Sequence, residues 1–195
     1  MFRSVIAAFL LTAPTAAALG QVDSGVARMS AAQPGEGPAW SLATMPNGCM
    51  VQAVSPQGTM LSVWGFAGEE KLGFLLQNPE WTVRDGQSYA LEVEFLGARS
   101  WPVEATARQE IDADGPGLYF TLQPGSASSK GFLASFTTAE GMRVQPDGVE
   151  ADTLPLAGSR GAMSSLARCL SERWSRAASQ GAAEESEEKV ALATS

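Results

Sequence analysis

The chain has 195 residues and a formal net charge of −8, and it contains two cysteines and no histidine. Nucleic acids and anionic membranes select basic surfaces, so neither is predicted as a partner of so acidic a chain. The absence of histidine excludes Ser-His-Asp and Cys-His catalytic arrangements and removes the commonest zinc ligand.

Residues 1–20 have the composition of a secretory signal peptide. Arg3 supplies a positive charge, residues 5–11 form an apolar run, and a series of small residues reaches Ala18. Cleavage is expected after Ala18 or after Gly20. The apolar run is shorter than the stretch of about 20 residues that spans a bilayer, so no transmembrane segment is predicted. The N-terminus therefore predicts a periplasmic or secreted protein.

A flexible linker rich in Gly, Ala, Ser and Pro is expected over residues 21–38. A single α+β domain follows, over residues 39–177, and its apolar runs separated by turn residues predict an antiparallel sheet, either curved or folded into a small sandwich. Strands are expected at 49–54, 59–66, 71–77, 88–96, 101–108, 118–123, 142–145 and 149–154.

Alternation within two of these strands predicts which side chains share a face. In the strand at 59–66, Trp64 is expected on the same face as Met60 and Ser62. In the strand at 88–96, the apolar residues alternate with Glu92 and Glu94, which indicates one buried face and one face in contact with water.

Two helices are expected in the second half of the domain. A short one carries Phe132, Leu133 and Phe136, with Ser128 or Ser129 as its cap. An amphipathic helix then runs from about residue 158 to about 177, with apolar residues at helical spacing that end at Trp174. Residues 178–195 are rich in Ala, Ser and Glu and are expected to form an acidic, disordered tail.

Cys49 and Cys169 are predicted to form a disulfide, because an even number of cysteines in an exported protein favours pairing. The bond would join the first predicted strand to the last predicted helix. A redox-active pair usually has the spacing Cys-x-x-Cys, which this sequence lacks.

No catalytic residue, metal site or cofactor is predicted. Asp112-x-Asp114 begins like a calcium-binding loop but lacks the further oxygen ligands and the closing glutamate that such a loop needs. Glu92 and Glu94 form the one carboxylate pair whose spacing suits glycoside chemistry, although exposed charges on a strand face are far commoner.

The five tryptophans are expected to lie mostly in the core, because large aromatic side chains dominate burial. Trp81 and Trp101 each lie at the end of a strand beside a proline or a turn, so one of them is expected to be exposed. Aromatic side chains are enriched at interface hot spots, so these two are candidate anchors for a partner.

The C-terminal part of the domain carries a family resemblance. The pattern is Phe132-Leu133-x-x-Phe136, then Arg143-Val144, Asp147-Gly148 and Leu154-Pro155-Leu156-Ala157-Gly158-Ser159, followed by Leu166 and Cys169. It resembles the C-terminal part of small periplasmic proteins related to the invasion-associated locus B family. The resemblance covers about 40 residues, implies an envelope protein without established catalysis, and transfers no site residue.

Together these features predict a non-catalytic, exported binding protein whose sheet face or Trp-bearing edge contacts another envelope protein. Two alternatives remain open. One is an inhibitor or accessory factor of a secreted hydrolase, a role that suits a small domain held rigid by a disulfide. The other is a hydrolase that uses carboxylates alone, for which Glu92 and Glu94 are the pair to test. The sequence does not specify the oligomeric state.

Overall fold

The computed structural model describes residues 26–27, 39–109, 115–146 and 152–193, and α2 beyond Ser179 is described by its backbone. The predicted signal peptide and most of the predicted linker lie outside these ranges, as do residues 110–114 and 147–151.

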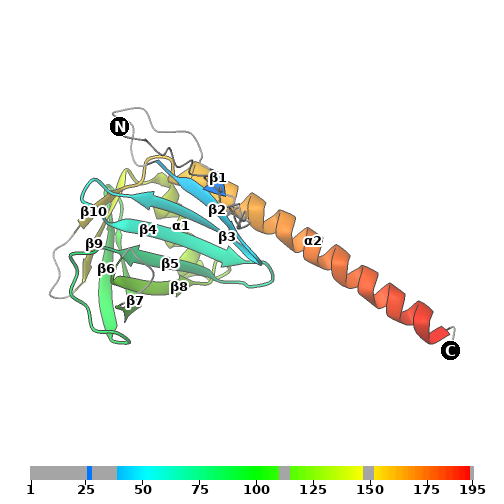
Figure 1. The fold of residues 1–195 in the computed structure, drawn as a ribbon. Helices are drawn as coiled ribbons and strands as arrows, with labels where there is room; N and C mark the ends of the chain where they lie inside the picture. The colour runs from blue at the N-terminus through cyan, green and yellow to red at the C-terminus, as the bar shows by residue number, and fades with distance from the viewer. Residues whose placement is uncertain (1–25, 28–38, 110–114, 147–151, 194–195) are drawn as a thin grey trace, which may run out of the picture.

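The described residues form ten strands and two helices (Figure 1). The predicted strands are found within two residues at most ends, except that the last is shorter. Two strands before residue 48 had not been predicted. The elements are β1 (Val26–Ala27), β2 (Ser41–Met45), β3 (Gly48–Val54), β4 (Met60–Phe66), β5 (Leu72–Gln77), β6 (Ser88–Phe95), β7 (Ser100–Arg108), β8 (Gly117–Leu122), α1 (Ala127–Thr138), β9 (Gly141–Pro146), β10 (Asp152–Pro155) and α2 (Ser159–Ala193).

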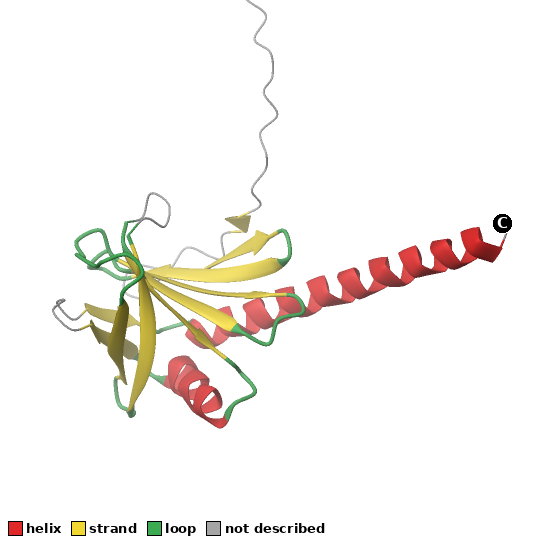
Figure 2. Ribbon diagram, turned by 90° about the horizontal axis from the view of Figure 1, so that it is seen from below, coloured by secondary structure: helices red, strands yellow, loops and turns green. Residues whose placement is uncertain are grey.

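All ten strands belong to one antiparallel sheet with the order β1-β2-β3-β4-β5-β8-β7-β6-β9-β10. The sheet does not close among the described residues, and β1 and β10 form its edges. The predicted α+β class with mostly antiparallel strands is confirmed. Figure 2 shows one strongly curved sheet, because the accumulated twist turns β6, β7 and β9 away from the direction of β3 and β4.

The hairpin between β3 and β4 shows how local sequence sets the register. The backbone N–H of Ser55 donates to the carbonyl of Thr59 at 2.8 Å. Gly58 has φ +90°, a backbone conformation that residues other than glycine rarely adopt. The backbone N–H of Thr59 also donates to the Ser55 hydroxyl at 3.1 Å. This turn pairs Val54 with Met60, which fixes the face on which every residue of both strands lies.

The core lies between the concave side of the sheet and α1, and its centre is a cluster of aromatic rings. Phe74 stacks on Phe120 with ring centroids 5.1 Å apart and meets Phe132 and Phe136 of α1 edge to face at 5.5 and 5.7 Å. Phe95 reaches the same two α1 rings from β6. These rings join both halves of the curved sheet to one helix, so their burial organises the whole domain.

The N-cap of α1 is Ser126, which corrects the expectation of Ser128 or Ser129. The Ser126 hydroxyl accepts a hydrogen bond from the backbone N–H of Ser129 at 3.2 Å, and the Ser126 backbone is extended, as a cap requires. The Ser129 side chain is itself buried inside the first turn. The sequence offers three serines as possible caps, at positions 126, 128 and 129. Ser129 is buried within the helix, and Ser126 is the residue that caps it.

Helix α2 is longer than the sequence pattern predicted. It begins after Gly158 and continues for 35 residues to Ala193. The segment from residue 178, which was expected to be a disordered tail, is therefore helical up to Ala193. The reason is that Ala, Glu and Gln are strong helix formers as well as residues typical of solvated tails. Within the described residues, neither helix is long and apolar enough to cross a membrane.

Candidate functional site

The predicted disulfide is confirmed. Cys49 in β3 is bonded to Cys169 in α2, with their Cα atoms 6.2 Å apart, across a sequence separation of 120 residues. Cys49 is fully buried, and the adjacent Leu170 packs over Gly65 of β4. The bond therefore fixes the proximal part of α2 against the concave side of the sheet.

Trp81 and Trp101 are core residues, which corrects the expectation that one of them is an exposed anchor. Their side chains are 7% and 8% exposed. Trp101 shares its strand face with the buried Ala105, and its ring meets Phe132 of α1 at 6.3 Å. Trp81 lies between β5 and β6, where Trp81 and Val83 are buried and the residues that follow each of them are exposed. Proximity to a turn had indicated exposure; strand parity places Trp101 on the buried face of β7, whereas Trp81 is buried although it lies in no strand.

Glu92 and Glu94 both point to the solvent side of β6, as the alternation predicted. The Glu94 carboxylate is 3.8 Å from the Arg143 guanidinium, and both side chains are about half exposed. A shallow pocket of about 330 Å³ lies on the same strand pair, but its lining residues include neither glutamate. The arrangement offers no enclosed carboxyl group and so gives no support for glycoside chemistry. Asp112 and Asp114 lie outside the described residues, which hold no group of three potential metal ligands.

The most distinctive surface is the outer face of the sheet, turned away from both helices (Figure 1). The five adjacent strands β2, β3, β4, β5 and β8 contain no charged residue at all. We define the outer face as the side chains of these strands that point away from the core. Its central members are Met50, Gln52, Met60, Ser62, Trp64, Leu75, Tyr119 and Thr121.

Trp64 and Tyr119 form the centre of the outer face. Their rings are nearly parallel, at 19°, with centroids 5.6 Å apart. The space for this arrangement comes from Gly73, which pairs with Trp64 on the neighbouring strand. A Cβ atom at Gly73 would lie 2.4 Å from the Trp64 indole, so the ring occupies the place where a side chain would be. Both aromatic residues stay partly exposed while they cover buried neighbours such as Leu75.

We expect Gly73→Ala to destabilise the protein by about 1 to 3 kcal/mol, because the added methyl group must displace the Trp64 ring from a packed position. Urea unfolding of both proteins measures the change. Gly125→Ala is the matched control, since a Cβ atom there meets nothing within 4 Å, and we expect it to change stability by less than about 0.5 kcal/mol. Equal effects of the two substitutions would contradict the packing of Trp64 over Gly73.

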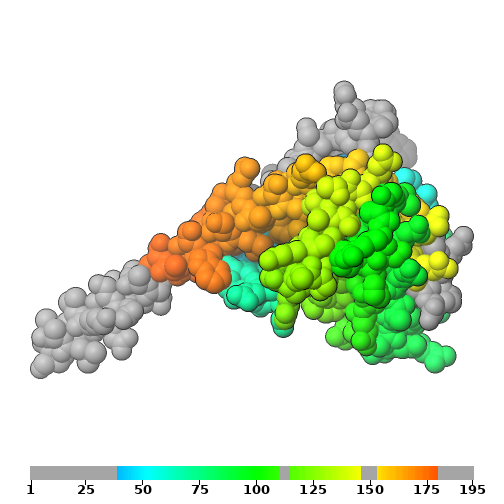
Figure 3. Space-filling model, turned by 180° about the vertical axis from the view of Figure 1, so that it is seen from behind, coloured from blue at the N-terminus to red at the C-terminus, as the bar shows by residue number. Residues whose placement is uncertain are grey.

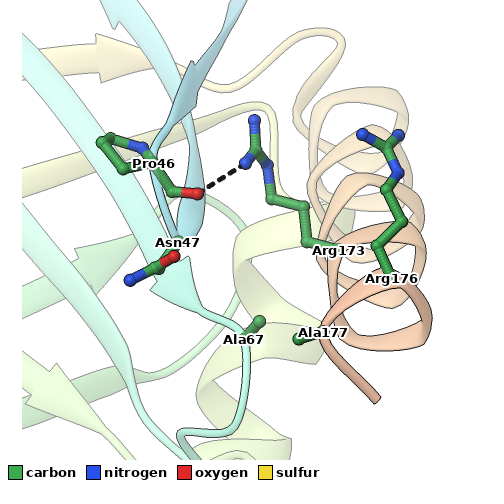
Figure 4. A pocket seen from close by; sticks show the side chains of 6 residues that line it. All are labelled: Pro46, Asn47, Ala67, Arg173, Arg176 and Ala177. Atoms are coloured by element: carbon green, nitrogen blue, oxygen red, sulfur yellow. Dashed lines mark hydrogen bonds between the residues drawn. The ribbon is translucent and has the colours of Figure 1, made fainter. Parts of the chain in front are cut away.

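A second surface lies at the base of α2, and none of its lining residues belongs to the outer face. Figure 4 shows the Arg173 side chain of α2 reaching toward Pro46, whereas the Arg176 side chain on the same helix does not point toward that loop. Both arginines line a recess of about 460 Å³ together with Pro46, Asn47, Ala67 and Ala177. The Arg173 guanidinium donates to the Pro46 carbonyl at 2.8 Å, whereas Arg176 is largely exposed and lies 3.8 Å from Glu172.

Trp174 borders an adjacent apolar pocket of about 270 Å³, which shares Ala67 and Ala177 with the first recess. The indole rests against Gly68 and is 57% exposed, the most exposed large apolar side chain in the described part of the chain. Trp174 was expected to end the buried stripe of the helix. The side chains of the following residues 175–179 are exposed as well, since α2 extends beyond the body of the domain (Figures 2 and 3).

No protein-family model, curated protein or solved structure matches this chain. The resemblance to the invasion-associated locus B family therefore stays a prediction, and the function is inferred from the two surfaces described above.

Sequence reasoning did not single out Tyr119, Gly73, Arg173 or Arg176. A usable signal was present for the outer face, because residues 37–68 contain no charged residue in a chain that is otherwise rich in Glu. Exposed strand faces normally carry charged side chains, so their absence indicates a face that is not selected for contact with water alone.

Proposed function

We propose that this chain is a non-catalytic binding protein that works outside the cytoplasm and contacts another protein through its outer face. The observation that carries the proposal is the complete lack of charge across β2, β3, β4, β5 and β8. The partner that fits such a surface presents a flat, apolar and uncharged patch of its own.

The composition of the outer face supports this proposal. Protein interfaces are enriched in aromatic residues and methionine and depleted of charge at their centre. The outer face combines Trp64 and Tyr119 with Met50 and Met60, and Val54 at its end is 54% exposed. Ser62 and Leu75 of this face are already buried, so the free energy gained when a partner removes the face from water comes from its partly exposed rings and methionines and from Val54.

The disulfide supports the location outside the cytoplasm. Disulfides persist in the periplasm and in secreted proteins, whereas cytoplasmic thiols are kept reduced. The bond between Cys49 and Cys169 agrees with the signal-peptide composition of residues 1–20. Both features are expected of a protein whose partner lies in the cell envelope or beyond it.

A photoreactive amino acid placed at Trp64 tests the contact surface in cells that express the chain naturally. We expect ultraviolet light to produce one discrete crosslinked species containing a second protein, which mass spectrometry then identifies. The same photoreactive residue at Glu92, which is exposed on β6 outside the outer face, is the positional control and should give no such species.

A charge introduced into the outer face should abolish the contact. We expect Met50→Glu to reduce the Trp64 crosslink at least about tenfold, since a carboxylate would be desolvated at the centre of the interface. Ala90→Glu places the same charge on an exposed position of β6 and should leave the yield unchanged. A crosslink that survives Met50→Glu, or no discrete species from Trp64, would refute the assignment of the outer face.

A further inference from the structure

The distal part of α2 projects from the domain without a neighbour among the described elements (Figures 1 and 2). Its last anchors to the sheet region are the Cys169 disulfide, the Arg173 hydrogen bond to Pro46 and the contact of Trp174 with Gly68. The side chains of residues 175–179 are all exposed. From Trp174 to Ala193 the helix extends roughly 28 Å, at 1.5 Å per residue.

A helix that projects alone into water is marginally stable, because most helical stability in proteins comes from packing against other elements. The rest of the domain is held by a disulfide and an aromatic core. The distal part of α2 has neither, so a partner that lies along it would supply the missing contacts.

Charge is segregated along α2. The proximal part carries Arg160, Arg168, Arg173 and Arg176 with Glu172 as its acidic residue, whereas residues 184–188 contain four glutamates. The helix has no acidic residue in its first turn and no basic residue in its last turn. This distribution is the reverse of what the helix dipole favours in an isolated helix, which places acidic residues first and basic residues last.

An antiparallel neighbour of the same sequence would correct this mismatch, because it brings opposite helix ends and opposite charges together. We infer that a second copy of this chain lies antiparallel along α2, so that residues 184–188 of each copy meet Arg173 and Arg176 of the other. A two-fold axis beside Gln180 places Arg173 across from Glu187, and Arg176 across from Glu184. Both contacts then occur twice, as a two-fold interface requires.

The recess at the base of α2 fits this neighbour. Arg173 uses one of its five N–H donors on Pro46, which leaves donors for a carboxylate, and the Arg176 side chain is 71% exposed. Trp174 stands beside them as an exposed aromatic side chain, and tryptophan and arginine are the residues most often found at interface hot spots. The small side chains of Ala177 and Ala178 allow a second helix to approach closely.

Sedimentation equilibrium of the purified exported chain tests the inference. We expect a dimer in low salt, with a dissociation constant that rises at least about tenfold between about 50 and about 500 mM NaCl, because exposed charge pairs are screened by salt. A monomer in low salt at concentrations up to about 100 μM would overturn the inference, and so would a larger, open-ended assembly.

Two charge-reversed variants give the sharper test. The first carries Arg173→Glu with Arg176→Glu, and the second carries Glu184→Arg with Glu187→Arg. Each variant alone should be monomeric, since like charges would face each other across the two-fold axis. Mixed in equal amounts, the two variants should form a heterodimer, because each reversed set then meets a complementary one.

Arg160→Glu is the matched control, since Arg160 lies in the first turn of α2 and outside the part of the helix that the second copy would cover. The dissociation constant of the Arg160→Glu dimer should equal that of the native chain. Heterodimer formation by the mixed variants supports the inference, because a different partner protein is not required for it. Failure of the mixture to associate, or dimerisation of either variant alone, would overturn the antiparallel pairing and leave the proposed outer face untouched.

Discussion

Replacing both Cys49 and Cys169 by alanine should lower the free energy of unfolding by about 4 to 5 kcal/mol. The bond closes a loop of 120 residues, and cross-linking so long a loop removes a large conformational entropy from the unfolded chain. The loss is close to the whole stability of a small domain, so the variant is expected to be partly unfolded at physiological temperature. Urea unfolding followed by circular dichroism measures the difference.

Reduction provides an independent check on this prediction. The native chain in a strong thiol reductant should approach the stability of the double variant, whereas the double variant itself should not respond to the reductant. A loss below about 1 kcal/mol would mean that the unfolded chain is already compact enough for the bond between β3 and α2 to constrain little.

Phe74→Ala should destabilise the domain by about 3 to 5 kcal/mol. The ring is fully buried and contacts Phe120 of β8 together with Phe132 and Phe136 of α1. Its removal leaves a cavity between sheet and helix that rigid aromatic neighbours cannot fill by small adjustments. Equilibrium unfolding in urea reports the change, provided that the slope of the transition stays the same as in the native chain.

Phe66 provides a matched control within the same sheet. It is also a phenylalanine, at the end of β4, but it is 36% exposed, so Phe66→Ala should cost less than about 1 kcal/mol. Phe74→Leu keeps most of the buried volume and should fall between the two. If Phe66→Ala and Phe74→Ala had similar effects, the ring cluster around α1 would not be the organising core of the domain.

The outer face and the base of α2 are separate surfaces, and the fold holds them in a fixed relation. The disulfide ties α2 to β3, whose opposite side carries Met50 of the outer face. A dimer formed through α2 would therefore present two outer faces for binding. Two linked sites raise the effective affinity for a partner that is itself clustered or multivalent.

Much of the local structure was readable from the sequence because it depends on neighbours along the chain. Alternating apolar residues located β6, and the turn at 55–58 located the hairpin of β3 and β4. The pairing of Cys49 with Cys169 followed from the cysteine count and the inferred export. The same kind of reasoning placed Trp64 with Met60 and Ser62 on one face of its strand.

Only the tertiary structure decided which surfaces are free, because exposure depends on elements that are distant in sequence. Trp101 is covered by α1, whereas Trp174 borders a surface pocket beside Gly68 and is exposed. Strand order brings Trp64 of β4 beside Tyr119 of β8 across a glycine of β5, and no local pattern encodes that order. The sequence by itself determined most of the strands, the position of both helices, the disulfide and the parity of two strands. The packing of sheet against helices determined the candidate binding surfaces, since burial is a property of the assembled fold.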